Sequence, residues 1–297
     1  MNLLITGAWA SAKEHIGEIE TLGHTVAFLQ QERDALPCDP AWVEGVICNG
    51  LFLHHPIEEF GNLRFIQLTS AGFDRVDMDY VQAHGIEIHN AKGVYSIPMA
   101  EFSVAGVLQL YKQARLFYEN QQAHRWEKHR GLLELCGKTV TIIGCGSVGI
   151  ECAKRFQAFG CKVIGINRTL RADAAFEAIL PLDNLDEALP KTDVLLLTVA
   201  LTSETKHLMD RHRLGLLPRS AVVVNISRGN VLDGAVLREQ LSAGSLAGAV
   251  LDVFETEPLS ESDPLWDMPN VIVTPHNSFV GEENRERLDT VVLSNLR

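Results

Sequence analysis

The chain has 297 residues, enough for two domains that each bury a core, and its composition is that of a globular protein. Its formal charge of -12, from 38 acidic and 26 basic residues, argues against nucleic acid or an anionic membrane as a partner. The six cysteines show no CxxC pair and no metal-like spacing with histidine, so we expect reduced thiols, no metal site and a cytoplasmic location.

The first part of the chain alternates short β-rich runs with helical patterns. No basic region precedes the N-terminal run, which we interpret as a strand and not as a signal peptide. Nowhere do 18 apolar residues follow one another, so no transmembrane helix is expected. The predicted strands are Leu3–Thr6, Thr25–Leu29, Gly45–Cys48, Leu63–Leu68 and Ile86–His89, and the predicted helices are Lys13–Leu22 and Asp77–His84.

A long helix is predicted next, from Pro98 to Gln122. Ser96 and Pro98 supply its start signal, and Phe102 and Ala105 begin its apolar stripe. We interpret this helix as a bridge between two domains.

A second alternation of strands and helices begins at Thr139. Its helices are expected after the first strand and at Asp186–Leu189, Met209–Leu217 and Gly234–Ala243, with a last helix at Glu282–Leu296. Its six predicted strands are Thr139–Ile143, Lys162–Ile166, Asp193–Val199, Ala221–Ile226, Ala247–Val253 and Val271–Thr274. The fold class predicted is therefore α/β, with two doubly wound parallel-sheet domains, the second a nucleotide-binding sheet.

A glycine-rich loop follows the first strand of this second alternation and matches GxGxxG. Gly144 allows a tight turn, Gly146 allows the backbone to approach a pyrophosphate, and Gly149 allows close packing of helix and strand. Ser147 and Val148 open the helix, whose free N–H groups and positive dipole end attract phosphates. A structural strand–helix turn is the alternative, but the correct flanks on both sides favour dinucleotide binding.

Three chemically complementary side chains follow the ends of the last three strands. Arg228, Glu257 and His276 stand shortly beyond the fourth, fifth and sixth strands of the second alternation. Because ligands bind beyond the carboxyl ends of the strands in such sheets, we expect these side chains to converge on one rim.

The types of these three residues fit the reduction of a 2-keto acid by hydride. Arg228 can bind the carboxylate and polarise the carbonyl. His276 can donate a proton as imidazolium, and Glu257 can orient the ring and favour its charged form. Singly, each has an ordinary alternative as a turn cap, a solvated acid or a packed histidine, but their coincidence above a dinucleotide loop favours catalysis.

Five stretches of the sequence, in chain order, resemble one known family. They are Ser70-Ala71-Gly72-Phe73-Asp74, Gly144–Gly149, Asn225-Ile226-Ser227-Arg228-Gly229, Leu251–Leu259 and Thr274-Pro275-His276. On these residues the sequence resembles the D-isomer-specific 2-hydroxyacid dehydrogenases, which include glyoxylate/hydroxypyruvate reductases and D-lactate dehydrogenases. The resemblance implies an NAD(P)-dependent enzyme with the three residues above as its catalytic set.

The resemblance also implies how the domains divide and what else lines the site. It implies a flavodoxin-like substrate-binding domain of residues 1–97 plus 280–297 and a Rossmann domain of residues 98–279. The N–H groups of Ala71 and Gly72 are implied to bind the substrate carboxylate. Family members are usually homodimers, and Tyr111–Trp126 lies in the arm that is implied to join them. The implied cofactor contacts include Val199, Ala200, Thr205, Ser227 and Asp252, the last with the nicotinamide amide.

The second strand of the nucleotide-binding sheet departs from the NAD-type pattern. Where an acidic residue should bind the ribose, the sequence has Asn167-Arg168-Thr169, with Arg171 nearby. A missing carboxylate and an adjacent base both favour a 2′-phosphate, so NADPH is predicted over NADH. NAD stays possible, because Asn167 can instead bind the ribose while Arg168 points into solvent.

Substrate size and the class of protein leave two further alternatives. Phe279, with Leu51 and Phe52 opposite, is predicted to form an apolar pocket for a small aliphatic keto acid, although Phe279 can instead pack between domains. An NAD(P)-sensing corepressor of the same fold can keep the same three catalytic side chains. Turnover of 2-keto acids distinguishes that sensor from an enzyme.

Overall fold

The computed structural model describes residues 1–297 and divides the chain into two compact units. One unit comprises Met1–Tyr95 with Gly281–Arg297, and the other comprises Ser96–Val280. The boundaries expected from the sequence differ from these by two residues or fewer. None of the helices is both long and apolar enough to cross a membrane.

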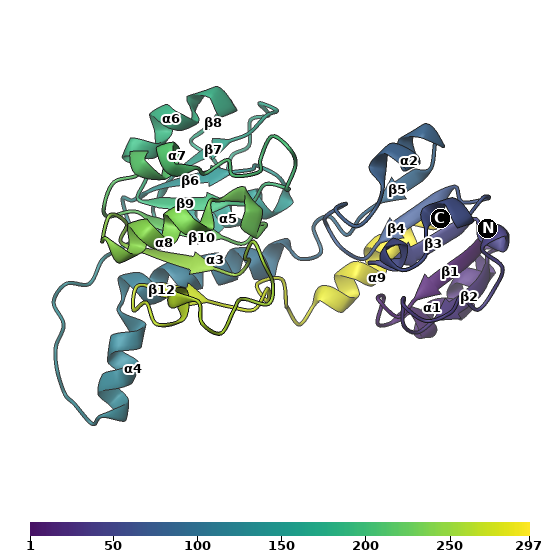
Figure 1. The fold of residues 1–297 in the computed structure, drawn as a ribbon, viewed down its shortest axis with the longest axis horizontal. Coiled ribbons are helices and arrows are strands. Elements are labelled where there is room, and N and C mark those ends of the chain that lie inside the picture. The colour runs from purple at the N-terminus through teal and green to yellow at the C-terminus, as the bar shows by residue number, and fades with distance from the viewer. The chain divides into compact units, whose positions relative to one another are not determined.

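The first unit is built on a parallel five-stranded sheet of order β2-β1-β3-β4-β5 (Figure 1). Its helices are α1 (Ala12–Thr21), α2 (Met78–Ala83) and the C-terminal α9 (Asn284–Asn295). The order is that of flavodoxin-like folds, in which the strand order reverses beside the first strand. The strands are β1 (Asn2–Thr6), β2 (Thr25–Leu29), β3 (Gly45–Cys48), β4 (Phe65–Leu68) and β5 (Glu87–His89).

Alternate residues of these strands supply two cores, one on each face of the sheet. Leu3 and Ile5 pack with α1 and with Val292 of α9, whereas Leu4 packs on the opposite face with Val81 of α2. All five side chains are almost fully buried. The period of two along a strand therefore explains how β1 is covered on both faces.

Asp289 ties the C-terminal helix α9 to the start of the chain. Its carboxylate accepts hydrogen bonds from Trp9 Nε1 at 2.6 Å and from the Ser11 hydroxyl, and it lies 3.2 Å from His15 Nε2. Burial opposes ionisation of Asp289, but these hydrogen bonds outweigh it and lower the pKa of the carboxyl. The C-terminal helix is thus an integral part of the first unit.

The second unit is built on a parallel seven-stranded sheet of order β12-β11-β10-β9-β6-β7-β8. The sequence analysis predicted six strands and missed β8, a three-residue edge strand. The helices are α3 (Ser96–Tyr111), α4 (Ala114–Gln122), α5 (Ser147–Ala158), α6 (Leu185–Ala188), α7 (Arg211–Leu216) and α8 (Gly234–Ser242). The strands are β6 (Thr139–Ile143), β7 (Lys162–Ile166), β8 (Ala178–Leu180), β9 (Val194–Leu197), β10 (Val222–Asn225), β11 (Gly248–Leu251) and β12 (Val271–Val273).

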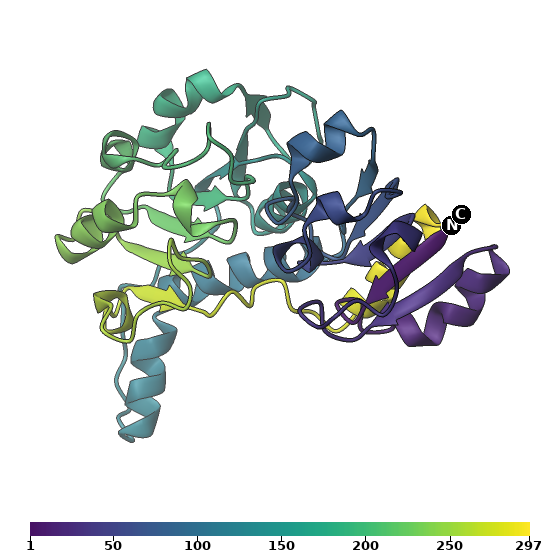
Figure 2. The same cartoon turned by 45° about the vertical axis from the view of Figure 1, so that its right-hand side comes forward.

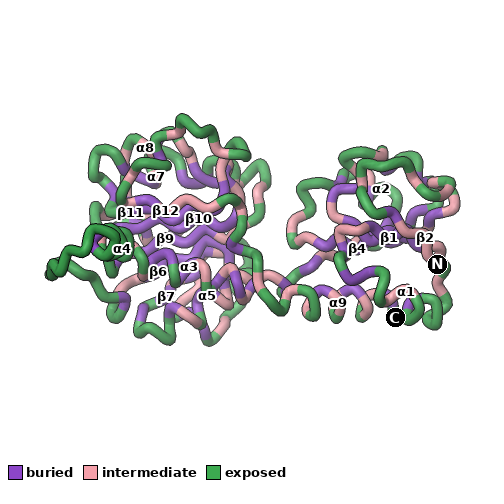
Figure 3. Tube along the Cα trace, turned by 90° about the horizontal axis from the view of Figure 1, so that it is seen from below, coloured by how far each residue is buried: buried purple, intermediate pink, exposed green.

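Helices cover both faces of the seven-stranded sheet. Leu195 and Leu197 of β9 face α6, α7 and α8, where Leu214 joins the same core. Leu196 faces the other way, toward α3 and α5, and packs in one core with Phe156. Figure 3 shows the result as buried strands surrounded by more exposed helices. The doubly wound architecture leaves the carboxyl ends of the strands as the place for loops that bind ligands.

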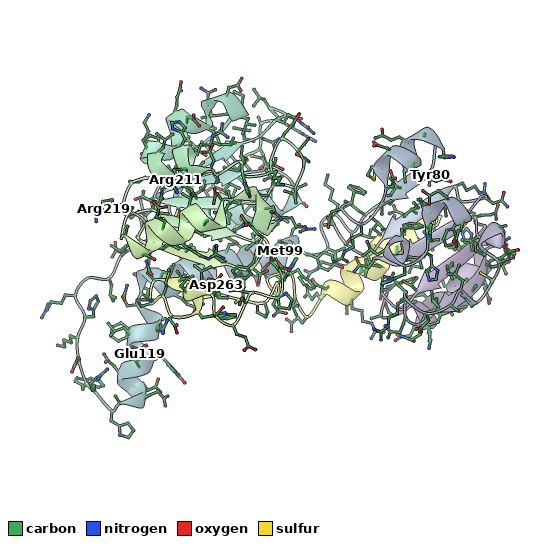
Figure 4. The ribbon with its side chains drawn as sticks, in the orientation of Figure 1. Tyr80, Met99, Glu119, Arg211, Arg219 and Asp263 are labelled. Atoms are coloured by element: carbon green, nitrogen blue, oxygen red, sulfur yellow. The ribbon has the colours of Figure 1, made fainter.

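The single helix predicted from Pro98 to Gln122 is wrong, because the chain breaks it in two. Gln113 adopts a left-handed conformation with φ 53° and ends the regular helix before α4 begins. Figures 1 and 2 both show α4 extending away from the seven-stranded sheet, and Figure 4 places Glu119 on it. Most residues of α4 are exposed, which leaves this helix without a core of its own.

Candidate active site

The glycine loop after β6 has a geometry that only glycine permits at two positions. Gly144 has φ 101°, and a Cβ there would lie 2.9 Å from the carbonyl carbon of Thr198. A Cβ on Gly149 would lie 2.0 Å from the carbonyl oxygen of Gly144. The Thr198 hydroxyl donates to that same oxygen at 2.6 Å. Strand, loop and helix therefore pack more closely than any side chain would allow.

The loop presents an open approach to the start of α5. Gly146 is the N-cap of this helix, and a Cβ there would meet nothing within 4 Å. The N–H groups of Ser147 and Val148, in the first turn, have no acceptor within the helix. Free donors, the positive end of the helix dipole and open space fit a pyrophosphate. These residues suit the dinucleotide predicted from the sequence.

Asn167 holds the glycine loop from the neighbouring strand. Its Oδ1 accepts the N–H of Cys145 at 3.2 Å, and its Nδ2 donates to the carbonyl oxygen of Thr169 at 2.8 Å. The Cys145 thiol lies against β7, and burial raises its pKa to about 12. The loop thus carries a neutral thiol, and the Asn167 amide links the Gly144–Gly149 turn to the end of β7.

Other predicted cofactor contacts lie on loops after β7 and β9. Arg168 is exposed, with its Nη1 3.6 Å from Oε2 of Glu204. Val199 is half-buried against the core, and Ala200 accepts a 2.7 Å hydrogen bond from the Thr205 hydroxyl. These residues flank the glycine loop from both sides, because β7 and β9 are the two neighbours of β6.

His276 and Glu257 form a hydrogen-bonded pair on the loops after β12 and β11. Nδ1 of His276 lies 2.9 Å from Oε2 of Glu257, and the other carboxylate oxygen accepts the N–H of Phe254 at 3.0 Å. The side chains are 38% and 36% exposed. Since a carboxylate only accepts, Nδ1 carries a proton and Nε2 is the nitrogen left to exchange one with a ligand.

Asp252 fixes the loop that carries His276. Its carboxylate accepts from the Thr274 hydroxyl at 2.6 Å and from the N–H groups of Asn277 and Ser278 at 2.7 and 2.9 Å. His276 itself has φ 52°, and its N–H donates to the Asp252 carbonyl oxygen at 2.8 Å. Asp252 is fully buried, so its carboxylate is engaged with the chain rather than presented to solvent.

Arg228 stands on a short turn that the end of β10 supports. The buried amide of Asn225 accepts from both the N–H and the hydroxyl of Ser227 and donates to the Arg228 carbonyl oxygen at 3.1 Å. Nη1 of Arg228 donates to the Ser227 carbonyl oxygen at 2.8 Å. The N–H and the hydroxyl of Ser227 therefore both donate to Asn225, and its carbonyl oxygen accepts from Arg228.

Gly229 brings the arginine loop against the glutamate loop. A Cβ at this position would lie 1.9 Å from the carbonyl carbon of Phe254 and 2.3 Å from the nitrogen of Glu255. The two backbones touch at this point, three residues before Glu257. The loops of Arg228 and Glu257 are consequently fixed to each other by direct backbone packing.

Phe279 follows the histidine loop and meets His276 edge to face. Their ring centroids lie 6.2 Å apart with planes at 82°, and Phe279 is 40% exposed. The second unit thus brings Arg228, Glu257, His276 and Phe279 to loops at the carboxyl ends of three adjacent strands, β10, β11 and β12.

The predicted substrate residues of the first unit lie on loops after β3 and β4. Ala71 accepts a 2.6 Å hydrogen bond from Asn90 Nδ2, and Gly72 accepts one of 3.1 Å from the Ser70 hydroxyl. The backbone of this turn is therefore held by its carbonyl groups, while its N–H groups make no hydrogen bond within this unit. Leu51 is fully buried in the core of the unit, so its prediction as a pocket wall is wrong.

Sequence reasoning missed the residues that position the site. Asn225, Gly229 and Thr274 were quoted as parts of motifs without a role of their own. Gly229 could have been recognised from its position directly after the candidate arginine. The backbone of Phe254 excludes a side chain there. Asn225 bonds Ser227 and Arg228 of its own turn, so its spacing from Ser227 was a local signal. The partner of Thr274, Asp252, lies after the neighbouring strand, which no local pattern reveals.

Comparisons with known proteins agree with this geometry. Residues 104–278 match the model of the D-isomer specific 2-hydroxyacid dehydrogenase, NAD binding domain. A glyoxylate reductase from Thermofilum pendens is 33% identical over 243 residues, which cover 79% of this chain and 71% of that protein. A D-3-phosphoglycerate dehydrogenase from Methanocaldococcus jannaschii is 32% identical over 81% of this chain but only 46% of its own length.

A solved structure extends the similarity to the whole chain. It is a D-isomer specific 2-hydroxyacid dehydrogenase from Xanthobacter autotrophicus Py2 in complex with NADPH and MES. It is 28% identical and gives a TM-score of 0.81 over 100% of this chain and 94% of that one. The family model, the sequence relatives and the fold all indicate one enzyme family. This chain belongs to the D-isomer specific 2-hydroxyacid dehydrogenases.

Proposed function

We propose that this enzyme reduces small 2-keto acids to D-2-hydroxy acids and prefers NADPH, with His276, Glu257 and Arg228 as its catalytic residues. The observation that carries the proposal is the 2.9 Å contact between His276 Nδ1 and Glu257 Oε2. It supports an acid–base role for the histidine, because the pair fixes both the ring and its tautomer.

His276 is the proposed proton donor. With Nδ1–H bound to Glu257, the imidazolium releases its Nε2 proton to the substrate carbonyl oxygen and becomes the neutral Nδ1–H tautomer. Solvent then restores the proton before the next turnover. A bound reduced nicotinamide supplies the hydride for the carbonyl carbon, and in the reverse reaction His276 takes up the hydroxyl proton through Nε2.

Arg228 is the proposed anchor and electrophile. Its guanidinium can bind the substrate carboxylate in a bidentate manner and polarise the adjacent carbonyl. The backbone contact at Gly229 supports this role, since it fixes the arginine loop against the loop of the Glu257–His276 pair. The N–H groups of Ala71 and Gly72 are proposed as further donors to the carboxylate.

Preference for NADPH is proposed from the end of β7. Asn167 replaces the acid expected for an NAD enzyme, and Arg168 and Thr169 follow it. Both Asn167 hydrogen bonds go to the chain's own backbone, which leaves Arg168 and the exposed Arg171 as the donors to a 2′-phosphate. The X. autotrophicus relative, solved with NADPH, supports the same choice.

The pocket for the side chain of the substrate is proposed to be small and apolar. The half-exposed ring of Phe279, edge-on to His276, would contact a short aliphatic side chain beside the reacting carbonyl. Glyoxylate, the substrate in the name of the T. pendens relative, is the smallest 2-keto acid.

We further propose a cytoplasmic homodimer. The exposed aromatic side chains Tyr118 and Trp126, on and after α4, support association through this arm, since Trp126 is 97% exposed.

A substrate panel tests the proposed function. Glyoxylate, pyruvate, 2-ketobutyrate and hydroxypyruvate should each be tried with NADPH and with NADH, and kcat/KM compared. The proposal predicts turnover of the small acids, a D-hydroxy product from pyruvate and 2-ketobutyrate, and a higher kcat/KM with NADPH. Cofactor binding without turnover of any 2-keto acid would instead favour an NAD(P)-sensing protein.

A further inference from the structure

The two loops that flank the glycine loop are joined by an ion pair. Arg168 follows β7 and Glu204 lies on the loop after β9, and these strands are the two neighbours of β6 (Figure 1). Arg168 Nη1 lies 3.6 Å from Glu204 Oε2. The ion pair therefore joins the two loops on either side of the strand that carries the glycine loop.

Hydrogen bonds within each loop set the positions of both residues. Thr202 N–H donates to the Thr205 hydroxyl at 2.7 Å, and Thr205 N–H donates to the Thr202 hydroxyl at 3.2 Å. On the other side, Asn167 Nδ2 closes the turn by donating to the Thr169 carbonyl oxygen. Because both turns are closed, the backbones that carry Arg168 and Glu204 are held with their side chains within reach of each other.

The pair is accessible to a ligand and weak enough to be displaced. The Arg168 side chain is 86% exposed and that of Glu204 is 69% exposed. A pair this exposed contributes little, whereas a phosphate monoester carries up to two charges and three acceptor oxygens. A phosphate can therefore replace the carboxylate on the guanidinium, but it must first overcome Glu204, which occupies Arg168 and repels the anion.

We propose that Glu204 is a specificity-determining residue that competes with the 2′-phosphate of the cofactor for Arg168. The inference rests on the proposed use of NADPH. It adds that a carboxylate of the same chain, Glu204, competes with the phosphate for Arg168. Glu204 lowers the affinity for 2′-phosphorylated nucleotides and leaves the affinity for nucleotides without that phosphate unchanged. The size expected from exposed ion pairs is about two- to fivefold in affinity.

Calorimetric binding of nucleotide fragments tests this without turnover. Adenosine 2′,5′-bisphosphate and 5′-AMP are titrated into the full-length wild type, Glu204→Gln, Arg168→Ala and the double variant. Glu177→Gln is the matched control, because it removes one exposed acid of the same unit that makes no ion pair. We expect Glu204→Gln to bind the bisphosphate about two- to fivefold more tightly, with 5′-AMP and the control unchanged.

The double variant separates competition from simple repulsion. In the Arg168→Ala background, Glu204→Gln should have a clearly smaller effect, because the shared guanidinium is gone. An equal effect in both backgrounds, or no effect in the wild type, overturns the proposal. If the wild type does not prefer the bisphosphate over 5′-AMP, the proposed NADPH preference fails as well, whereas an insensitive Glu204→Gln with that preference intact removes only the role of Glu204.

Discussion

The hydroxyl of Thr274, two residues before His276, donates a 2.6 Å hydrogen bond to the buried carboxylate of Asp252. The same carboxylate accepts two N–H groups just beyond the histidine. The buried side chain of Asp252, with its three donors, thus holds the loop that carries His276 in place. His276 needs this support because its backbone lies at φ 52°, a region that non-glycine residues rarely adopt.

Replacing Asp252 by Asn should therefore uncouple the loop from the sheet. The amide retains one acceptor atom but turns its other end into a donor, which cannot accept the N–H of Ser278. Each hydrogen bond to a charged group contributes about 1.5–3 kcal/mol, so we expect a lower Tm and a fall in kcat. Thr274→Ser should retain the hydroxyl contact and most activity, while Thr274→Val should not. If Asp252→Asn, Thr274→Ser and Thr274→Val all had the kcat of the wild type, the loop would not depend on this carboxylate.

Substitution of Gly229 by Ala should damage the site through the backbone alone. The added Cβ would lie 1.9 Å from the Phe254 carbonyl carbon, so the loops of Arg228 and Glu257 must move apart. A displacement of about 1 Å can cost about 10²-fold in rate, and we expect a loss of kcat/KM on that order.

Gly215→Ala is the matched control for this change. A Cβ on Gly215, within α7, would meet nothing within 4 Å, so this variant should be as stable as the wild type or slightly more stable. Comparable activity of the two alanine variants would contradict the packing argument.

An acid at position 167 should change the cofactor preference. Asn167→Asp keeps an acceptor for the Cys145 N–H, loses the donor to Thr169 and adds a charge that repels a 2′-phosphate. We expect the ratio of kcat/KM for NADPH to that for NADH to fall at least tenfold. Asn167→Ala removes both hydrogen bonds without adding charge, and so reports the effect of geometry alone. A ratio that falls equally in both variants would exclude charge as the cause.

Stability of the first unit should depend on pH through Asp289. Its hydrogen-bonded carboxylate has a lowered pKa in the folded chain, so its charge stabilises the fold above the unfolded pKa of about 3.9. This stabilisation is lost as pH falls through the folded pKa. Asp289→Asn should therefore lower the urea midpoint at pH 7, and the difference from wild type should shrink in acid. A difference that is the same at pH 7 and below pH 3 would contradict this.

Patterns within single strands and turns predicted most of the fold. Short apolar runs between turn residues are strong local signals, and four strands have the predicted bounds: Thr25–Leu29, Gly45–Cys48, Thr139–Ile143 and Lys162–Ile166. β8 was missed, since an edge strand of three half-buried residues lacks such a signal. The break at Gln113 was missed because its left-handed backbone has neither glycine nor proline to mark it.

The candidate site was predictable only in part. Arg228, Glu257 and His276 could be named because each stands at the end of a strand in a parallel sheet, where ligands bind. The support from Asp252 could not be read from sequence, since it acts across neighbouring loops, whereas Asn225 bonds Ser227 within its own turn and was overlooked. Leu51 was misjudged because an apolar residue after a strand can turn into the core as readily as toward a ligand.

The most direct test of the central claim is single-turnover reduction of a 2-keto acid by His276→Ala, with NADPH binding measured on the same protein. If His276 donates the proton, the rate should fall by about 10²–10⁴-fold while the Kd for NADPH stays within about twofold of the wild type. A rate within tenfold of the wild type, with binding unchanged, would contradict the assignment of His276 as the acid.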